Sequence, residues 1–88
     1  MSKAIANVDD LKRLQRAARK AEEDIQQAIK QLNKELARAD WHDDRRRDFE
    51  SKLKDATSAV QRTTRQLQAL QPILQRAISD LSNYLKRS

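Results

Sequence analysis

Residues 49–84 read FESKLKDATSAVQRTTRQLQALQPILQRAISDLSNY. Apolar or small residues recur along this segment at strictly alternating steps of four and three. Such a heptad repeat predicts one long α-helix with a continuous seam that packs against another helix. Pro72 falls on the side opposite this seam, so the seam can continue past it. The predicted seam consists of Phe49, Leu53, Ala56, Val60, Thr63, Leu67, Leu70, Leu74, Ala77, Leu81 and Tyr84.

A second apolar stripe precedes this segment and has the same helical spacing. Ile29 and Leu36 lie beside it and widen it. The stripe predicts a first helix that offers its apolar side to the second helix. Its members are Leu11, Leu14, Ala18, Ala21, Ile25, Ala28, Leu32 and Ala39.

Residues 40–48, DWHDDRRRD, separate the two stripes and contain one apolar residue, Trp41. Asp43 or Asp44 can cap the start of a second helix by accepting a backbone N–H bond. We therefore expect helices over about residues 8–38 and 44–86, with a turn at 39–43. The fold class is then all-α: a coiled-coil-like antiparallel two-helix hairpin, about 50–60 Å long at ~1.5 Å per residue. One domain covers residues 1–88.

The heptad phase offers an alternative, because it continues from the first stripe into the second without a skip. The segment between the stripes also lacks Gly and Pro. One continuous helix in a parallel coiled coil has the same phase. The hairpin is favoured because Glu35, His42 and Arg46 occupy three neighbouring core positions.

One hairpin leaves a flank of each stripe exposed, so we expect two hairpins to associate into a four-helix bundle. Ile29, Leu36, Ile73, Ile78 and Leu85 are expected at that second interface. The helix–helix interfaces together are predicted to use Leu11, Leu14, Ile25, Ile29, Leu32, Leu36, Leu53, Val60, Leu67, Leu70, Leu74, Ile78, Leu81 and Tyr84.

The composition offers little chemistry. The 88 residues include no Cys, and this absence excludes disulfides and thiolate metal sites. They also include no Gly and a single His. His42 lies beside Asp40, Asp43 and Asp44, but no nucleophile or phosphate-binding loop accompanies it. We expect a protein that is not an enzyme and that has no catalytic residue, cofactor or metal.

The sequence contains no apolar run of the roughly 20 residues that a membrane span needs. Residues 1–10 lack the apolar centre of a signal peptide. The expected location is the cytoplasm, and export without a cleaved signal peptide remains compatible with the sequence.

The chain carries 19 Lys and Arg against 13 acidic residues, a net charge of +6. A basic chain of this kind raises the question of nucleic-acid or anionic-surface binding. Acidic neighbours balance the Arg triplet at residues 45–47, and stacking aromatics are scarce, so nucleic acid is not the favoured partner. The candidate patch for an anionic partner is Lys12, Arg13, Arg16, Arg19, Lys20, Arg45, Arg46 and Arg47.

Trp41 and Phe49 form a signature at the turn, with Asp43 between them. With this pair, the chain resembles the small W-x-G helical-hairpin proteins of type VII (ESX-like) secretion, in which an aromatic residue follows the turn Trp by eight positions. Asp43 stands where that family has Gly. The family's secretion signal does not follow Tyr84, since residue 88 is Ser.

The resemblance implies a bacterial protein-interaction module that acts as a partner, adaptor or chaperone for a larger helical effector or a secretion assembly. The expected partner is a second copy of the chain or another helical protein. Two alternatives remain: a generic structural coiled-coil adaptor, and a basic helical protein associated with nucleic acid.

Overall fold

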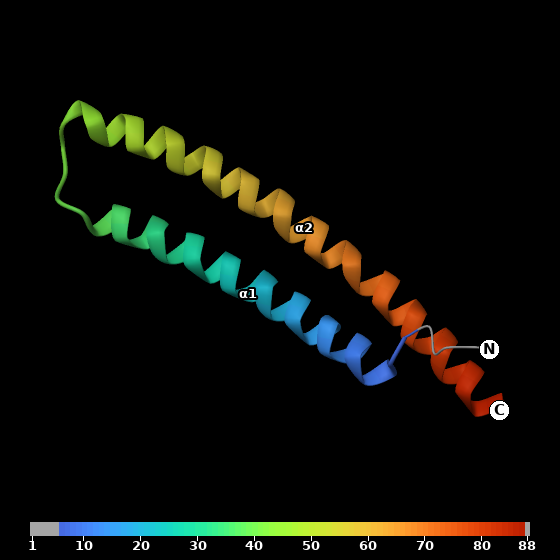
Figure 1. The fold of residues 1–88 in the computed structure, drawn as a ribbon. Helices are drawn as coiled ribbons and strands as arrows, with labels where there is room; N and C mark the ends of the chain where they lie inside the picture. The colour runs from blue at the N-terminus through green and yellow to red at the C-terminus, as the bar shows by residue number, and fades with distance from the viewer. Residues whose placement is uncertain (1–5, 88) are drawn as a thin grey trace.

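The computed structural model of the chain describes residues 6–87, without the side chain of residue 87. The ends of the expected domain, residues 1–5 and 88, lie outside this description. Two helices, α1 (Val8–Arg38) and α2 (Asp44–Arg87), run antiparallel and are joined by one short turn (Figure 1). The all-α helical hairpin expected from the sequence is confirmed, and the chain does not form one continuous rod.

The hairpin measures 68 × 18 × 17 Å and is longer than expected. The difference comes from α2, which has 44 residues against 31 in α1. At ~1.5 Å per residue, α2 alone spans about 66 Å. Pro72 lies inside α2 and is exposed, and the helix continues past it to residue 87.

The start of α1 follows from local chemistry. The Asn7 side-chain oxygen accepts a hydrogen bond from the Asp10 backbone N–H at 3.1 Å and so caps the helix. Asp9 and Asp10 lie in the first turn, where their negative charges interact favourably with the positive end of the helix dipole.

The seam of α2 contains the leucine and valine positions that the heptad repeat predicts. Leu53 is buried, and Val60, Leu67, Leu74 and Leu81 are half-buried. The residues that alternate with them along the buried side are Thr57, Thr64, Gln71 and Ile78.

On α2, the prediction is therefore wrong by one residue for the positions that alternate with these leucines and the valine. Phe49, Ala56, Leu70 and Tyr84 are exposed, and Thr63 and Ala77 are only half-buried. The same displacement occurs on α1, where Gln15, Glu22, Ile29 and Leu36 are half-buried while Leu14, Ala21 and Ala28 are exposed.

This shift also corrects the second interface expected from the sequence. Ile78 is 7% exposed and belongs to the core of the hairpin. Ile29 and Leu36 of α1 are half-buried on the side of α1 that faces α2. Ile73 and Leu85 are exposed, as a second interface would require. An apolarity pattern cannot separate the two phases, because both share the same Leu positions.

Polar side chains pair across the seam and account for the observed phase. Asn33 Nδ2 donates to Thr57 Oγ1 at 3.2 Å, and Gln68 Nε2 donates to Glu22 Oε1 at 2.8 Å. Near the open end, Gln71 Nε2 donates to the backbone carbonyl of Gln15 at 3.1 Å. These bonds form only when the polar positions of the two helices face each other.

The seam is not fully satisfied. Thr64 is 5% exposed, and its hydroxyl oxygen has no hydrogen-bond partner among the described residues; the same is true of Gln71 Oε1. Leaving a buried polar atom unpaired is unfavourable by about 1–3 kcal/mol. The hairpin therefore retains a destabilising feature at its centre.

We predict that Thr64→Val raises the free energy of unfolding by about 1 kcal/mol, because it replaces an unpaired buried hydroxyl with a methyl group of similar size. Thr57→Val is the matched control. The Thr57 hydroxyl accepts from Asn33 and donates to the Leu53 carbonyl at 2.8 Å, so its loss should lower the same quantity by about 1 kcal/mol. Urea unfolding followed by circular dichroism measures both. Effects of the same sign would contradict the observed seam.

Candidate functional site

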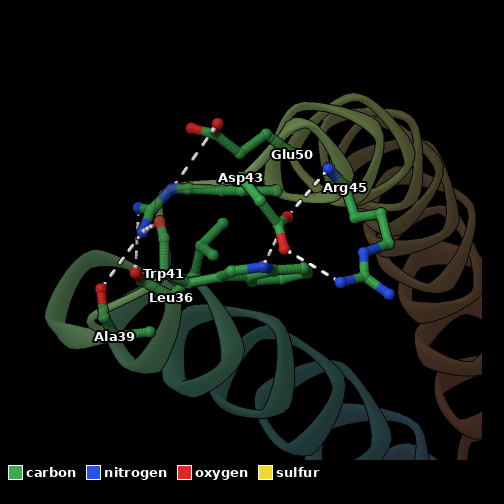
Figure 2. Close-up of polar contacts among 7 residues, drawn as sticks. Leu36, Ala39, Trp41, Asp43, Arg45 and Glu50 are labelled. Carbon is green, nitrogen blue, oxygen red and sulfur yellow. Dashed lines mark hydrogen bonds and ion pairs between the residues drawn. The ribbon is translucent and has the colours of Figure 1, made fainter.

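The turn reverses the chain without glycine. Arg46, in the first turn of α2, donates three hydrogen bonds to backbone carbonyls at the C-terminal end of α1 and in the turn itself (Figure 2). Arg46 Nη2 reaches Leu36 at 3.1 Å, and Nη1 reaches Ala39 at 3.1 Å and Trp41 at 3.0 Å. The last carbonyls of a helix lack partners within the helix and are commonly satisfied through a C-terminal Gly. Here a guanidinium from the next helix takes that role.

The charge of Arg46 suits this position. The C-terminal end of α1 carries the partial negative charge of the helix dipole, which a nearby cation stabilises. Glu50, one helical turn further along α2, lies 3.6 Å from Arg46 Nε and orients the guanidinium. The Arg46 side chain is 22% exposed, so water screens these contacts less than it screens the outer ion pairs.

Asp43 caps the start of α2. Its Oδ1 accepts from the Arg45 backbone N–H at 2.9 Å and from the Trp41 indole N–H at 2.8 Å. Its Oδ2 accepts from the Arg45 guanidinium at 3.1 Å. Asp43 thus fixes the turn through its side chain.

The environment of Asp43 changes its acidity. Desolvation, the largest single influence, raises the pKa of Asp43. Hydrogen bonds from the Arg45 side chain, from the Trp41 indole and from the backbone of Arg45 and Arg46 together outweigh it, so the pKa lies below its ordinary value.

Trp41 is half-buried and packs edge-on against Phe49, with ring centroids 5.6 Å apart and planes at 61°. Such edge-to-face aromatic pairs are favourable beyond their buried area. The turn signature of Trp41, Asp43 and Phe49 is therefore one connected unit in space. Phe49 remains 38% exposed on its outer side.

An apolar face runs along one side of the hairpin. It is centred on a groove of about 400 Å³ between the helices, lined by Leu14, Ala17 and Ala18 of α1 and by Leu67, Leu70, Ile73 and Leu74 of α2. Residues seven apart lie on the same side of a helix, so Ala21 and Ala28 follow Leu14, while Phe49, Ala56 and Tyr84 follow Leu70. Ile73 and Tyr84 are 66% and 64% exposed.

A polar groove of about 630 Å³ lies between the helices elsewhere along the hairpin. It is lined by Gln26, Gln27, Ile29, Lys30, Asn33, Thr57, Val60, Gln61, Thr64 and Arg65. None of its residues is shared with the apolar groove. Gln26 and Lys30 of α1 occupy heptad positions on the flank of that helix opposite to Leu14, and Gln61 and Arg65 of α2 do the same relative to Leu70. The polar groove therefore lies on the side of the hairpin opposite to the apolar groove.

The candidate anionic-partner patch is divided by the fold. Lys12, Arg16 and Arg19 share the polar side of α1 and are exposed. Arg13 and Lys20 pair instead with Asp10 and Asp24 on their own helix. The hydrogen bond and charge of Asp24, in that order, raise the pKa of Lys20. In the triplet, Arg45 and Arg46 are engaged in the turn, and Arg47 is exposed.

His42 Nε2 lies 2.7 Å from the Asp40 carboxylate, and both side chains are largely exposed. No group of three or more His or acidic side chains within residues 6–86 is arranged to hold a metal ion. Neither helix, over the part of the chain described, contains an apolar stretch long enough to cross a membrane.

Comparison of the chain with known protein families, curated proteins and solved structures found no match.

We predict that Arg46→Lys lowers the free energy of unfolding by about 1.5–3 kcal/mol, because an ammonium group cannot form the same fork of bonds to three carbonyls. Arg47→Lys is the matched control, since Arg47 is exposed, and it should change this quantity by less than about 0.5 kcal/mol. Chemical unfolding of both variants measures the difference. Equal effects would show that the turn does not depend on Arg46.

The lowered pKa of Asp43 predicts a pH dependence. A carboxylate with a depressed pKa stabilises the folded state above its unfolded pKa of about 4, and this contribution is lost as the pH falls through the folded value. The stability difference between wild type and Asp43→Asn should therefore shrink as the pH falls below about 4. Thermal unfolding measured from pH 2 to 7 tests this. A difference that does not vary with pH would contradict it.

Proposed function

We propose that this chain is a non-enzymatic protein-interaction module whose apolar face pairs with the apolar face of a second copy. The observation that carries the proposal is the concentration of exposed apolar side chains on one side of the hairpin. Leu14, Phe49, Leu70, Ile73 and Tyr84 are each more than a third exposed, at 38–66%. The groove joins Leu14, Leu70 and Ile73 into one apolar patch, and an exposed apolar patch marks an interaction site in proteins.

The charges bordering the apolar face favour a second copy as the occupant. Asp10, Asp24 and Glu35, on the α1 side of this face, each pair with a basic residue of the same helix. Local pairing leaves little unbalanced charge beside the apolar residues. Two copies, each with a net charge of +6, can therefore bring these faces together while most of the excess charge stays outside the contact.

Pairing two hairpins through this face gives a four-helix bundle. It covers the alanines of α1 with the larger Leu, Ile and aromatic side chains of α2, as bundle packing favours. Small residues opposite large ones allow the helices to approach closely. The buried apolar core of the hairpin consists of Leu53 and Ile78 among the described residues, and so small a core also suggests that the hairpin gains stability from a partner.

The resemblance of the turn to W-x-G proteins supports a more specific role within this proposal. The module would act as a partner, adaptor or chaperone for a larger helical effector or a secretion assembly. The resemblance lies in the spacing of Trp41 and Phe49 in the sequence, and these two side chains pack against each other in the hairpin.

Sedimentation equilibrium tests the pairing. We expect a mass of twice the 10.2 kDa chain at micromolar concentrations. Leu70→Glu places a charge in the apolar groove and should weaken dimerisation by at least tenfold, as desolvating an unpaired charge does. Gln61→Glu, which adds the same charge to the polar groove, is the matched control and should leave the dimer intact. A monomeric wild type, or equal effects of both variants, would refute self-pairing.

A further inference from the structure

The polar side of the hairpin carries most of the net charge. Gln26, Lys30, Gln61 and Arg65 line the polar groove, and each belongs to a series of residues seven apart that faces the same way. We call this side the basic face. Its basic residues are Lys12, Arg16, Arg19 and Lys30 of α1, and Arg47, Lys54, Arg65 and Lys86 of α2.

The division of charge between the two sides is sharp. The basic face has these eight basic side chains against three acidic ones, Asp9, Glu23 and Asp44, a net charge of +5 out of +6 for the chain. The apolar face is counted in the same way, from the residues in phase with Leu14, Ala17, Leu70 and Ile73. Up to residue 86 it has three basic and four acidic side chains, a net charge of −1: Arg38, Arg45 and Lys52 against Asp10, Asp24, Glu35 and Asp80.

The charges on the basic face are not neutralised within the hairpin. None of its eight basic side chains forms an ion pair with the acidic residues of the described chain; the six ion pairs present use other basic residues. All eight residues are exposed. Positive charges held close together on one surface repel each other, and a bound anionic ligand reduces this repulsion.

Hydrogen-bond donors accompany the charges. The side chains of Gln26, Gln27 and Gln61 line the polar groove and have no hydrogen-bond partner among the described residues. Ser58 and Ser79 lie in phase with Arg65 on the outer side of α2. Amide and hydroxyl groups beside Lys and Arg are the usual contacts to phosphate oxygens.

We propose that the basic face binds the phosphate backbone of double-stranded nucleic acid without sequence preference. The face extends along a hairpin 68 Å long, so several phosphates can be neutralised at once. It has no aromatic side chain on which unpaired bases could stack, which favours a duplex over a single strand. Five of the seven large apolar residues that are exposed lie on the apolar face, and none belongs to the basic face, so this face offers an anionic membrane no exposed large apolar side chain to insert.

This function is independent of the pairing proposed above, because the two faces share no residue. It also differs from the patch expected in the sequence. The basic face excludes Arg13, Lys20, Arg45 and Arg46, which are engaged in ion pairs, and includes Lys30, Lys54, Arg65 and Lys86.

Fluorescence anisotropy with a labelled DNA duplex of about 24 base pairs, titrated with the full chain at several salt concentrations, tests the proposal. The triple variant Arg16→Gln, Arg19→Gln and Lys30→Gln removes three charges from the basic face. The control, Lys52→Gln, Arg62→Gln and Arg76→Gln, removes three charges elsewhere and lowers the net charge to the same +3. Circular dichroism establishes that both variants fold.

We expect wild type and control to bind with similar affinity and a steep dependence on salt. The basic-face variant should bind more than tenfold more weakly near 0.1 M salt, and the slope of log K against log salt should fall by up to about 2.7, or ~0.9 per lost contact. Equal losses in both triple variants would overturn the proposal, because they would show attraction by net charge alone. No binding by wild type at low salt, or a preference for single strands or for phosphatidylserine vesicles over the duplex, would also overturn it.

Discussion

The hydrogen bonds from Arg46 to the carbonyls of Leu36, Ala39 and Trp41 are the constraint on which the rest of the structure depends. A chain without glycine lacks the residue that most often ends a helix in the left-handed conformation, and here only five residues separate the two helices. The guanidinium supplies the missing donors and a charge that suits the end of α1. Asp43 caps the start of α2, so side-chain hydrogen bonds hold the backbone of the turn at both of its ends.

The turn and the seam together determine what the hairpin presents to its surroundings. With Arg46 facing α1, the residues seven apart from it on α2, beginning with Leu53, face α1 as well. The polar residues Thr57, Thr64 and Gln71 then occupy the positions between them. The seam takes in polar side chains that pair across it, and several large apolar side chains stay on the outside. One side of the hairpin is consequently apolar and nearly neutral, while the other is polar and basic.

Much of this architecture could be predicted from the sequence. The heptad stripes and the acidic residues before the second helix predict two helices, their ends and an antiparallel hairpin. The phase of the seam could not be predicted, because Leu53 and Leu67 fit either of two adjacent interfaces and apolarity favours Leu70 over Gln71. Hydrogen bonds between side chains such as Asn33 and Thr57 decide the phase, and these depend on the relative positions of two helices. The role of Arg46 was also missed, since contacts between a guanidinium and carbonyls five to ten residues away leave no recognisable pattern in the sequence.

The division into two faces rests on the phase of the seam, so the most direct measurement is of that phase in solution. In ¹³C-labelled protein mixed with an excess of unlabelled protein, nuclear Overhauser effects selected for ¹³C at both protons report only contacts within one chain. The account predicts that Thr64 and Ile78 show such effects to side chains of α1, whereas Thr63 and Leu70 show weaker effects or none. Strong effects from Thr63 and Ala77 to α1, with none from Thr64 and Ile78, would contradict it and would exchange the buried and the exposed sides of the hairpin.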